Sequence, residues 1–387
     1  MATSADLLKR HKPFLKYDSQ ESYFADSAAT WTDNPGNRLL DKSGKELASA
    51  EHGLSPAFLG LTYPDKSKAD ARDRISNPSK DYREQARKLH ENKRYRNRMY
   101  GHAVLDSAGD VWLQYWFWYF FNDYNLIGNF LKAGLHEGDW EMIQIRLKGE
   151  TLDVAKPDLA IFAQHATADT RRWNQVDLVP GTERPLVYVA RGSHAAYFEP
   201  GRHWTGHWFD YADGKRKSPE ISLNIVVETD EDWRWVRWPG RWGDTKKGDN
   251  PLDSDSPQGP ADHDQWDDPL VMVEKAAERA APPPEDRPQP PAAPIVRVEW
   301  AGSVIRVLYT VQPGRDRKIP RGLAVTINSP EETAPPTTET FTISTRTGSV
   351  DLTTPADPAK SYDVYVSCAT AAGLASQSVR CDLDPVV

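Results

Sequence analysis

The sequence predicts a mainly β protein with two domains: a large antiparallel β-sandwich with few short helices, and a small C-terminal β-sandwich. Three observations lead to this fold class. Apolar runs with strand character recur through residues 1–280, with Gly, Pro and Asn between them. A proline-rich segment then interrupts the chain, and alternating β-branched runs follow it. Fourteen Trp, fifteen Tyr and eleven Phe provide large side chains for the cores.

The large domain is expected to span residues 1–280. Helical periodicity is convincing only around 79–92, and a short closing helix is expected at 270–280. Strand-like runs occur at 111–120, 140–147, 158–164, 186–190 and 221–227. Their lengths and separators favour antiparallel sheets that pack face to face and carry long loops. The densest apolar run, 111–121, is aromatic and short, so it predicts a buried strand.

The segment 281–294, APPPEDRPQPPAAP, is the clearest domain boundary. Prolines at this density favour an extended, semi-rigid spacer and cannot join a sheet ladder. The second domain is expected at 295–387, because strand-like runs at 295–300, 304–311, 323–327, 341–344 and 362–368 have the spacing of a small sandwich. The run 362–368, with the AAGLASQSV that follows, resembles the last hairpin of fibronectin type III domains. That resemblance implies a spacer or an adhesive unit.

Charge and composition narrow the classes of partner and compartment. The formal net charge of −8 argues against nucleic acid, because phosphate binding needs a concentrated basic face. The N-terminus has no apolar run that suits a secretory signal, and no segment approaches the roughly 18 apolar residues of a membrane span. We therefore expect a soluble protein, cytoplasmic or exported by a non-classical route, of unspecified oligomeric state. Cys368 and Cys381 lie on predicted neighbouring strands, where one disulfide and two free thiols both stay open.

The strongest chemical signal is the segment 136–141, HEGDWE, which leads directly into a strand. Because alternate side chains of a strand share a face, Asp139 and Glu141 point the same way and Trp140 points opposite. Two carboxylates at the start of an apolar face raise each other's pKa unless a cation compensates, and a divalent metal ion is the simplest such cation. His136, on the preceding loop, adds a nitrogen ligand. We therefore predict a metal site formed by His136, Asp139 and Glu141.

Oxygen-rich ligation favours Ca or Mg as the cofactor, with Mn and Zn as alternatives. Two further histidines, His165 and His194, occur at predicted strand ends, and we place them in the same pocket as candidate general bases. Plainer interpretations stay open. The two carboxylates could pair with Arg191 or Arg171, and His194 could be a core histidine bonded to backbone.

Two other histidine- or tryptophan-rich stretches have simpler interpretations. His203 and His207 favour a surface loop, because Gly and Trp surround them. The run 233–238, WRWVRW, favours a packed strand whose arginines extend along it. The sequence contains no GxSxG elbow, P-loop or dinucleotide fingerprint.

Several segments together resemble the vacuolar protein sorting sixty-two-related family. They are 13–24, PFLKYDSQESYF; the HEGDWE segment; 163–165, AQH; and 185–197, PLVYVARGSHAAY. Their order and approximate spacing resemble the family over residues 5–270, which implies that the large domain is a member.

A more distant likeness is to the necrosis- and ethylene-inducing peptide-like cytolysins. Their heptapeptide contains the pattern His-x-x-Asp-Trp-Glu, and its His, Asp and Glu hold a divalent cation on a β-sandwich. His136, Asp139 and Glu141 match those ligands position by position. Gly138 stands where those proteins have a second histidine, and no secretory signal is seen. The likeness therefore implies metal binding more than it implies membrane damage.

Three functional hypotheses follow from these patterns. The first is a divalent-cation-binding protein that recognises a glycan or lipid surface or acts as a toxin-like effector. The second is a metal-dependent hydrolase in which the cation activates water and His194 or His165 is the general base. The third is a structural core of ion pairs without a ligand. The sequence leaves open whether the protein is an enzyme.

Overall fold

The computed structural model describes residues 2–62, 70–78, 81–90, 97–124, 135–205, 209–216, 220–244, 255–278, 291–312, 319–329, 336–370, 376 and 378–386. Strands predominate and helices are few and short, which confirms the mainly β fold class. No helix among the described residues is long and apolar enough to cross a membrane.

The large domain contains short helices and many strands. Its helices are α1 (Ser4–Arg10), α2 (Ala28–Thr32), α3 (Pro56–Thr62), α4 (Tyr82–His90) and α5 (Val271–Ala277), with 3-10 helices η1 (Ala50–His52), η2 (Trp173–Gln175), η3 (Glu231–Arg237), η4 (Pro260–Asp262) and η5 (Asp264–Trp266). Its strands are β1 (Phe14–Tyr17), β2 (Arg38–Leu40), β3 (Glu46–Ser49), β4 (Arg74–Ser76), β5 (Arg98–Leu105), β6 (Val111–Asn122), β7 (His136–Lys148), β8 (Lys156–Gln164), β9 (Thr167–Arg172), β10 (Leu186–Val189), β11 (Ala196–Tyr197), β12 (Gly201–Trp204), β13 (Phe209–Ala212) and β14 (Ser222–Ile225). The five strand-like runs expected in this domain and both expected helices are thus confirmed, with boundaries shifted by a few residues.

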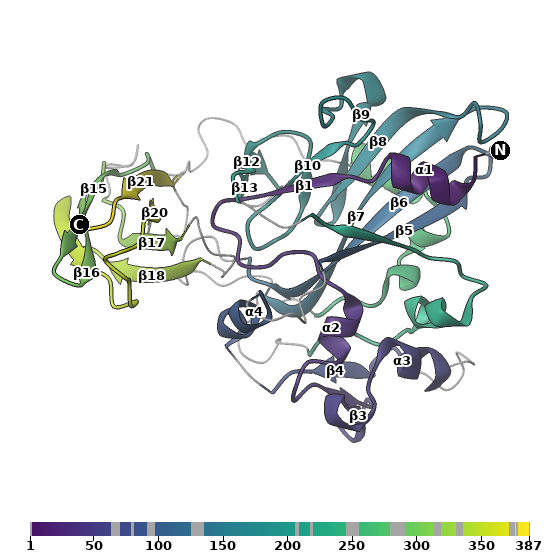
Figure 1. Cartoon of the computed structure of the whole chain (residues 1–387), viewed down its shortest axis with the longest axis horizontal. Helices are drawn as coiled ribbons and strands as arrows, with labels where there is room; N and C mark the ends of the chain where they lie inside the picture. The colour runs from purple at the N-terminus through teal and green to yellow at the C-terminus, as the bar shows by residue number, and fades with distance from the viewer. Residues whose placement is uncertain are drawn as a thin grey trace.

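A six-stranded sheet, in the order β14-β5-β6-β7-β8-β9, forms the centre of the large domain (Figure 1). Neighbouring strands in this sheet are antiparallel, except that β14 pairs parallel with β5. The central strand β6 is buried on both faces from Trp112 onward. This explains why its sequence is a continuous aromatic run and not an alternation of apolar and polar residues.

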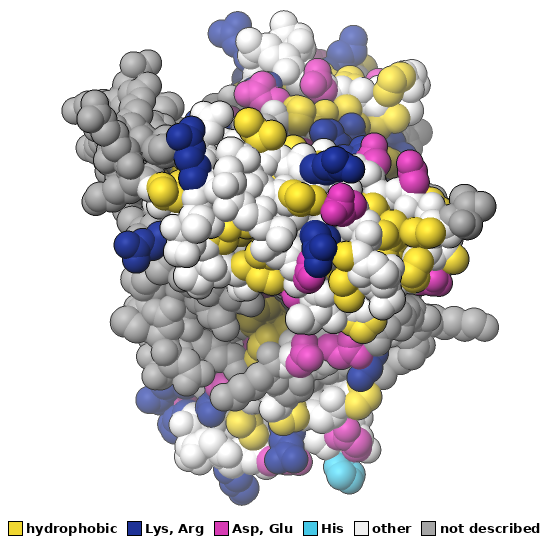
Figure 2. All heavy atoms as spheres, turned by 90° about the vertical axis from the view of Figure 1, so that its left-hand side faces the viewer, with side chains coloured by type: hydrophobic (Ala, Val, Ile, Leu, Met, Phe, Trp, Pro, Cys, Tyr) yellow, Lys and Arg dark blue, Asp and Glu magenta, His cyan; other side chains and the backbone are white. Residues whose placement is uncertain are grey.

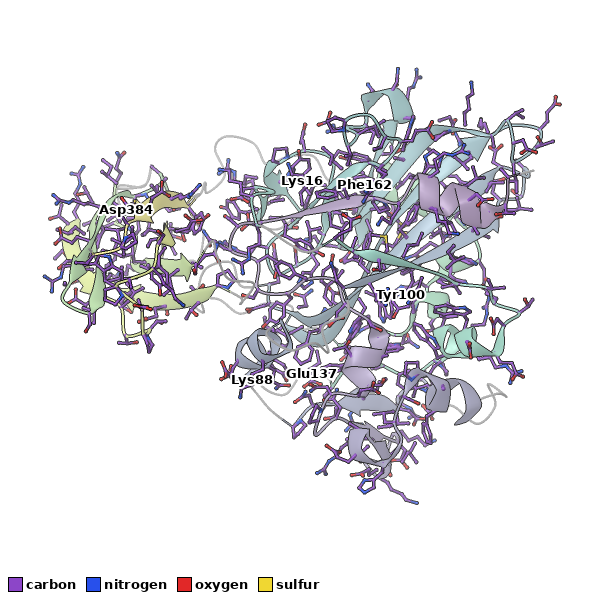
Figure 3. The ribbon with its side chains drawn as sticks, in the orientation of Figure 1. Lys16, Lys88, Tyr100, Glu137, Phe162 and Asp384 are labelled. Atoms are coloured by element: carbon purple, nitrogen blue, oxygen red, sulfur yellow. The ribbon has the colours of Figure 1, made fainter. Side chains whose placement is uncertain are left out.

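One face of this sheet packs against the smaller sheet β1-β10-β11. Tyr119 and Ile143 of the large sheet share this core with Leu15 and Val187, and Phe162 stacks on Phe198 with ring centroids 3.8 Å apart. In Figure 3, Phe162 lies on the side of β1 and β10, whereas Glu137 lies on the side of α2 and α4. This pair of packed sheets is the sandwich that the sequence predicts.

The opposite face of the large sheet carries a tryptophan-rich core. Trp118 and Trp140 lie opposite each other on β6 and β7, with ring centroids 5.4 Å apart, and both pack on Trp242. The run 233–238 joins this core as part of η3 and not as a strand, so the expected packed strand is wrong. Trp235, Val236 and Trp238 are buried, and the Trp238 amide donates to the Trp235 carbonyl oxygen at 3.0 Å, the i to i+3 bond of a 3-10 turn.

The C-terminal domain has a separate core between two sheets. Strands β15 (Ile295–Ala301), β16 (Val304–Thr310) and β19 (Thr347–Asp351) form one sheet, and β18 (Thr337–Thr342), β17 (Gly322–Asn328), β20 (Tyr362–Ala369) and β21 (Val379–Leu383) form the other. Figure 2, which faces this end of the molecule, shows hydrophobic, basic and acidic side chains interspersed among the described residues. Cys368 and Cys381 are both free thiols. Most of the predicted spacer at 281–294 lies outside the described residues.

Candidate active or binding site at the start of β7

The predicted orientation of the HEGDWE side chains is confirmed beyond Gly138. Trp140 packs in the tryptophan-rich core, and Ile143, which shares the parity of Asp139 and Glu141, packs in the core beneath the β1-β10-β11 sheet. The Asp139 carboxylate reaches His194 on that same side. Alternation along β7 thus places the two carboxyl groups at the edge of the inter-sheet core.

Gly138 interrupts the regular alternation of side chains within β7, just before Asp139. Its φ is +62°, and a Cβ there would lie 2.2 Å from the Trp118 ring. Only glycine tolerates both the left-handed backbone and this close approach. As a result, Glu137 turns to the other side of the sheet, where its carboxylate accepts hydrogen bonds from the Tyr82 hydroxyl at 2.5 Å and the Asp244 backbone at 2.7 Å. Glu137 therefore anchors loops, while Asp139 and Glu141 face the candidate site.

His194 is the residue that holds Asp139. Its Nδ1 lies 2.9 Å from Asp139 Oδ2, its Nε2 lies 3.7 Å from Glu21 Oε1, and its ring stacks on Tyr119 at 3.9 Å. Burial alone would lower the pKa of His194, but the carboxylates of Glu21 and Asp139 more than offset this and raise the pKa to about 9. His194 is therefore a buried imidazolium between two carboxylates. One of the plainer interpretations had its ring bonded to backbone. The ring is instead hydrogen-bonded to the carboxylate of Asp139.

His165 occupies a second part of the same region, with a different carboxylate. Its Nε2 lies 3.0 Å from Asp210 Oδ2 on β13, and the same oxygen accepts hydrogen bonds from the Ser193 and Tyr197 hydroxyls at 3.0 and 2.8 Å. The other oxygen, Asp210 Oδ1, is buried and has no hydrogen-bond partner among the residues that the structure describes. His165 keeps 30% of its side chain exposed, so the pair of His165 and Asp210 links the interior to the surface.

The backbone of both histidines has a left-handed conformation that residues other than glycine rarely adopt. His165 has φ +55° and His194 has φ +56°, and Asn97 is the other described non-glycine residue with a positive φ. A left-handed histidine costs about 1 kcal/mol or more, and such strain concentrates at functional sites. Two of the imidazoles in this region, those of His165 and His194, are thus carried on strained backbone.

His136 is oriented by its own strand. Its Nδ1 lies 2.6 Å from the Gly138 carbonyl oxygen, so Nδ1 carries the donated hydrogen and Nε2 is the ring nitrogen left for a ligand bond. Nε2 faces Asp139 Oδ1 at 4.0 Å. This separation is too long for a hydrogen bond, yet it is of the order that two ligand atoms of one ion adopt when each bond is about 2.0–2.4 Å.

Glu141 completes the group and is its least satisfied member. No hydrogen bond to its carboxyl group exists among the described residues. Its pKa is raised well above the ordinary value by burial and by the nearby carboxylates of Asp139 and Asp210. A neutral acid or a bound cation would each relieve this repulsion.

The arginines considered as partners for these carboxylates are engaged elsewhere. Arg171 pairs with Glu199 at 3.2 Å, and Arg191 donates to the Gln20 side chain. The proposed arginine pairing is therefore wrong, because His194 takes that place beside Asp139. Across the described part of the chain, no three His, Cys, Asp or Glu side chains converge closely enough to hold a metal ion as they stand.

Sequence reasoning missed two members of this site, Glu21 and Asp210. Glu21 follows β1 and accepts hydrogen bonds from its own loop at Ser22 and from Gly192. Asp210 lies in the hairpin of β12 and β13, where His203 stacks on Tyr197 at 3.8 Å. Glu21 lies within the opening stretch that resembles the family. Its role beside His194 follows only from its position in the fold. His203 lies in β12 and not in a loop, and His207 lies outside the described residues.

The comparison with known families decides the classification. The family model described as vacuolar protein sorting-associated protein 62 matches residues 2–216. The chain belongs to this family. A similar protein of Saccharomyces cerevisiae is TDA6, provisionally described as vacuolar protein sorting-associated, which is 25% identical over 185 residues. That match covers 36% of this chain, and the chain spans about a third of the length of the yeast protein (37%).

The matched range of the vacuolar protein sorting-associated protein 62 family contains the whole candidate site. Every site residue described above, from Glu21 to Asp210, lies between residues 2 and 216. The C-terminal domain and the tryptophan-rich η3 segment lie beyond it.

Proposed function

We propose that this member of the family binds a divalent cation through His136, Asp139 and Glu141, and uses it to recognise an anionic group on a glycan or lipid surface. The observation that carries the proposal is the arrangement of His136 Nε2 and Asp139 Oδ1, which face each other at 4.0 Å with no hydrogen bond between them. Glu141, whose carboxyl group accepts no hydrogen bond within the described ranges, supplies the third donor.

The surroundings of these three side chains fit a cation in their donor chemistry. The Gly138 carbonyl fixes the tautomer of His136, and His194 orients Asp139, which are the supporting contacts that metal ligands usually have. The carboxyl groups of Asp139 and Asp210 lie near Glu141 and raise its pKa, and Asp210 Oδ1 has no hydrogen-bond partner within the described part of the chain. A bound divalent ion would supply the missing positive charge and an attachment point for an anionic ligand.

The hairpin of β12 and β13 supports recognition of a surface. The ring centroids of Trp204 and Phe209 are 5.1 Å apart, and Cζ of the Arg202 guanidinium lies 4.4 Å from the centroid of the Phe209 ring. All three are at least partly exposed, and Asp210 follows Phe209 directly. Aromatic rings with an adjacent cation suit sugar rings and lipid headgroups.

The test begins with metal content and direct titration. Full-length protein purified without chelator is analysed for metal, and chelator-treated protein is titrated calorimetrically with Ca²⁺, Mg²⁺, Mn²⁺ and Zn²⁺. We expect one bound ion, loss of binding in Glu141→Gln, and affinity about 10–100-fold weaker in His194→Gln, which removes a supporting contact. Glu150→Gln, at an exposed position just after β7, is the matched control. Absence of binding by all four ions in the wild type would overturn the proposal.

The recognition step has its own assay. Glycan arrays and vesicles with and without phosphatidylserine are probed in the presence of the bound ion and again with EDTA. Binding that EDTA and Glu141→Gln both abolish supports cation-mediated recognition. Binding that survives both would exclude the ion from that role.

A second candidate function is hydrolysis, favoured by the pair of His165 and Asp210. His165 is partly exposed, its Nε2 is held by Asp210, and Asp139 adds to the charges that raise its pKa. His165 is thus better placed than the fully enclosed His194 to exchange a proton with a substrate or a water. A screen of ester and phosphoester substrates with His165→Gln, and with His203→Gln as the control, tests this candidate. Turnover that His165→Gln leaves unchanged would contradict it.

A further inference from the structure

Strand β17 of the C-terminal domain is buried along its whole length, from Gly322 to Asn328. Leu323, Val325 and Ile327 face the core of that domain. The residues between them face the other way, where a strand of a small sandwich is ordinarily exposed to solvent. Their burial shows that another part of the chain covers this face.

The covering part is the large domain, on the side of the β12–β13 hairpin (Figure 1). Tyr211 packs against Ala324 and Ala369 of the C-terminal domain. The Thr326 hydroxyl donates to Gln20 Oε1 at 3.4 Å. We refer to the face formed by Ala324, Thr326, Asn328 and Ala369 as the docking face.

Arg216 forms a buried, charged contact between the two domains. It follows β13, its guanidinium lies 5.8 Å from the Phe24 ring, and it donates a hydrogen bond to Asn328 Oδ1. Burial lowers the pKa of Arg216 to about 10. A charge removed from water to this extent requires a fixed partner, so the contact needs the C-terminal domain in place.

The residues that meet the docking face are chain neighbours of the residues that form the candidate site. Gln20 precedes Glu21, and Tyr211 follows Asp210. Arg191, which donates to Gln20, precedes Gly192, whose amide donates to Glu21 at 2.7 Å. Asp210 and Tyr211 are neighbours on strand β13, where successive side chains point to opposite sides. Gln20 lies in the turn after β1, and its side chain accepts from Thr326 while Glu21 accepts from Gly192. The same segments therefore carry the site on one side and contact the C-terminal domain on the other.

We propose that the C-terminal domain is a docked support that holds the segments carrying Glu21 and Asp210 in position, so that its docking sets the geometry of the site. In this role the C-terminal domain differs from the independent spacer that the fibronectin-like resemblance implies. This inference does not depend on which ligand the site binds, because it concerns the Glu21 and Asp210 segments alone.

The test uses single substitutions in the full-length chain. Ala324→Arg places a long cation in the docking face, and Ser349→Arg makes the same change at an exposed position of the opposite sheet. Small-angle scattering reports the separation of the domains. Hydrogen exchange reports the amides of Ser22 and Gly192, which donate to Glu21. We expect Ala324→Arg to enlarge the radius of gyration and to speed exchange at these two amides about tenfold or more, with Ser349→Arg unchanged.

Each alternative outcome has a definite meaning. Enlargement without faster exchange at Ser22 and Gly192 would show that docking does not position the site. A wild type whose scattering already fits separated domains would overturn the docking itself, as would an Ala324→Arg protein that stays compact. Exchange at Val307, in the core of the C-terminal domain, reports its folding. If Ala324→Arg unfolds that domain, the scattering and exchange measurements are made on Thr326→Glu instead.

Discussion

His194 Nδ1 lies 2.9 Å from Asp139 Oδ2, and this buried contact joins the turn after β10 to the start of β7. Segments that are far apart in the chain are thereby connected within the inter-sheet core. The charge on His194 also faces Glu21, so three ionisable side chains depend on one another.

Asp139→Ala is expected to destabilise the protein strongly. Removal of one partner leaves a buried imidazolium beside Glu21 alone, and breaking a buried pair typically costs about 3–5 kcal/mol. Urea denaturation measures the change, with Glu150→Ala as the exposed control. A loss below about 0.5 kcal/mol, the range of surface substitutions, would show that the contact does not stabilise the fold.

Gly138→Ala is expected to cost more than the same change at Gly109. Both glycines have positive φ, at +62° and +87°, but a Cβ at Gly109 meets nothing within 4 Å, whereas at Gly138 it meets Trp118 at 2.2 Å. Backbone strain alone costs about 1–2 kcal/mol, and overpacking adds about 1–3 kcal/mol at Gly138 only. Thermal melts of the two variants separate the contributions. Equal losses would mean that the tryptophan ring moves aside freely.

Asp18 is expected to make stability depend on pH near neutrality. Burial and the neighbouring carboxylate of Asp213 raise the pKa of Asp18 to about 7, against an ordinary 3.8. The folded state then binds more protons than the unfolded state between these two values, so the free energy of unfolding falls as pH rises through this window. Asp18→Asn removes this contribution. Its stability relative to wild type should therefore increase from pH 4 to pH 7 in urea titrations.

The control for this pH series is Asp384→Asn, at an exposed position. Its stability difference from wild type should stay constant with pH. If Asp18→Asn gave an equally flat difference, the carboxyl group of Asp18 would titrate alike in the folded and unfolded states.

Asp210→Asn is expected to lower the pKa of His165. Burial works to lower this pKa, and the Asp210 carboxylate raises it above the ordinary value through charge and a hydrogen bond. Without the carboxylate, burial dominates, so the pKa should fall below 6.5. NMR titration of the His165 ring measures the change, with Asp169→Asn as a control on neighbouring β9. An unchanged titration would show that Asp210 does not set the charge of His165.

Much of the framework was predictable because local patterns determine it. The aromatic run of β6 indicated a strand buried on both faces, and the parity of Asp139 and Trp140 gave their opposite orientations. The WRWVRW run misled because its alternation suits a strand, whereas the side chain of Asp230 caps the Asp232 amide and starts the η3 turn.

The polar part of the site was only partly predictable, because it depends on contacts between distant segments. His165 and His194 were recognised by residue type. Their carboxylate partners, Asp210 and Glu21, lie 45 and 173 positions away along the chain, and no local pattern pairs them. The positive φ of both histidines likewise results from the turns that bring these segments together.

The aromatic side chains divide between the two faces of the large sheet in a way that affects optical measurements. In the described part of the chain, every buried tryptophan belongs to the core around Trp118 and Trp140, whereas Tyr119 stacks on His194 beside the site. Emission from these buried tryptophans will therefore follow the loss of that core and will respond weakly to ligand binding on the other face. A Tyr119→Trp protein would carry an emitter against His194 and make the site visible by fluorescence.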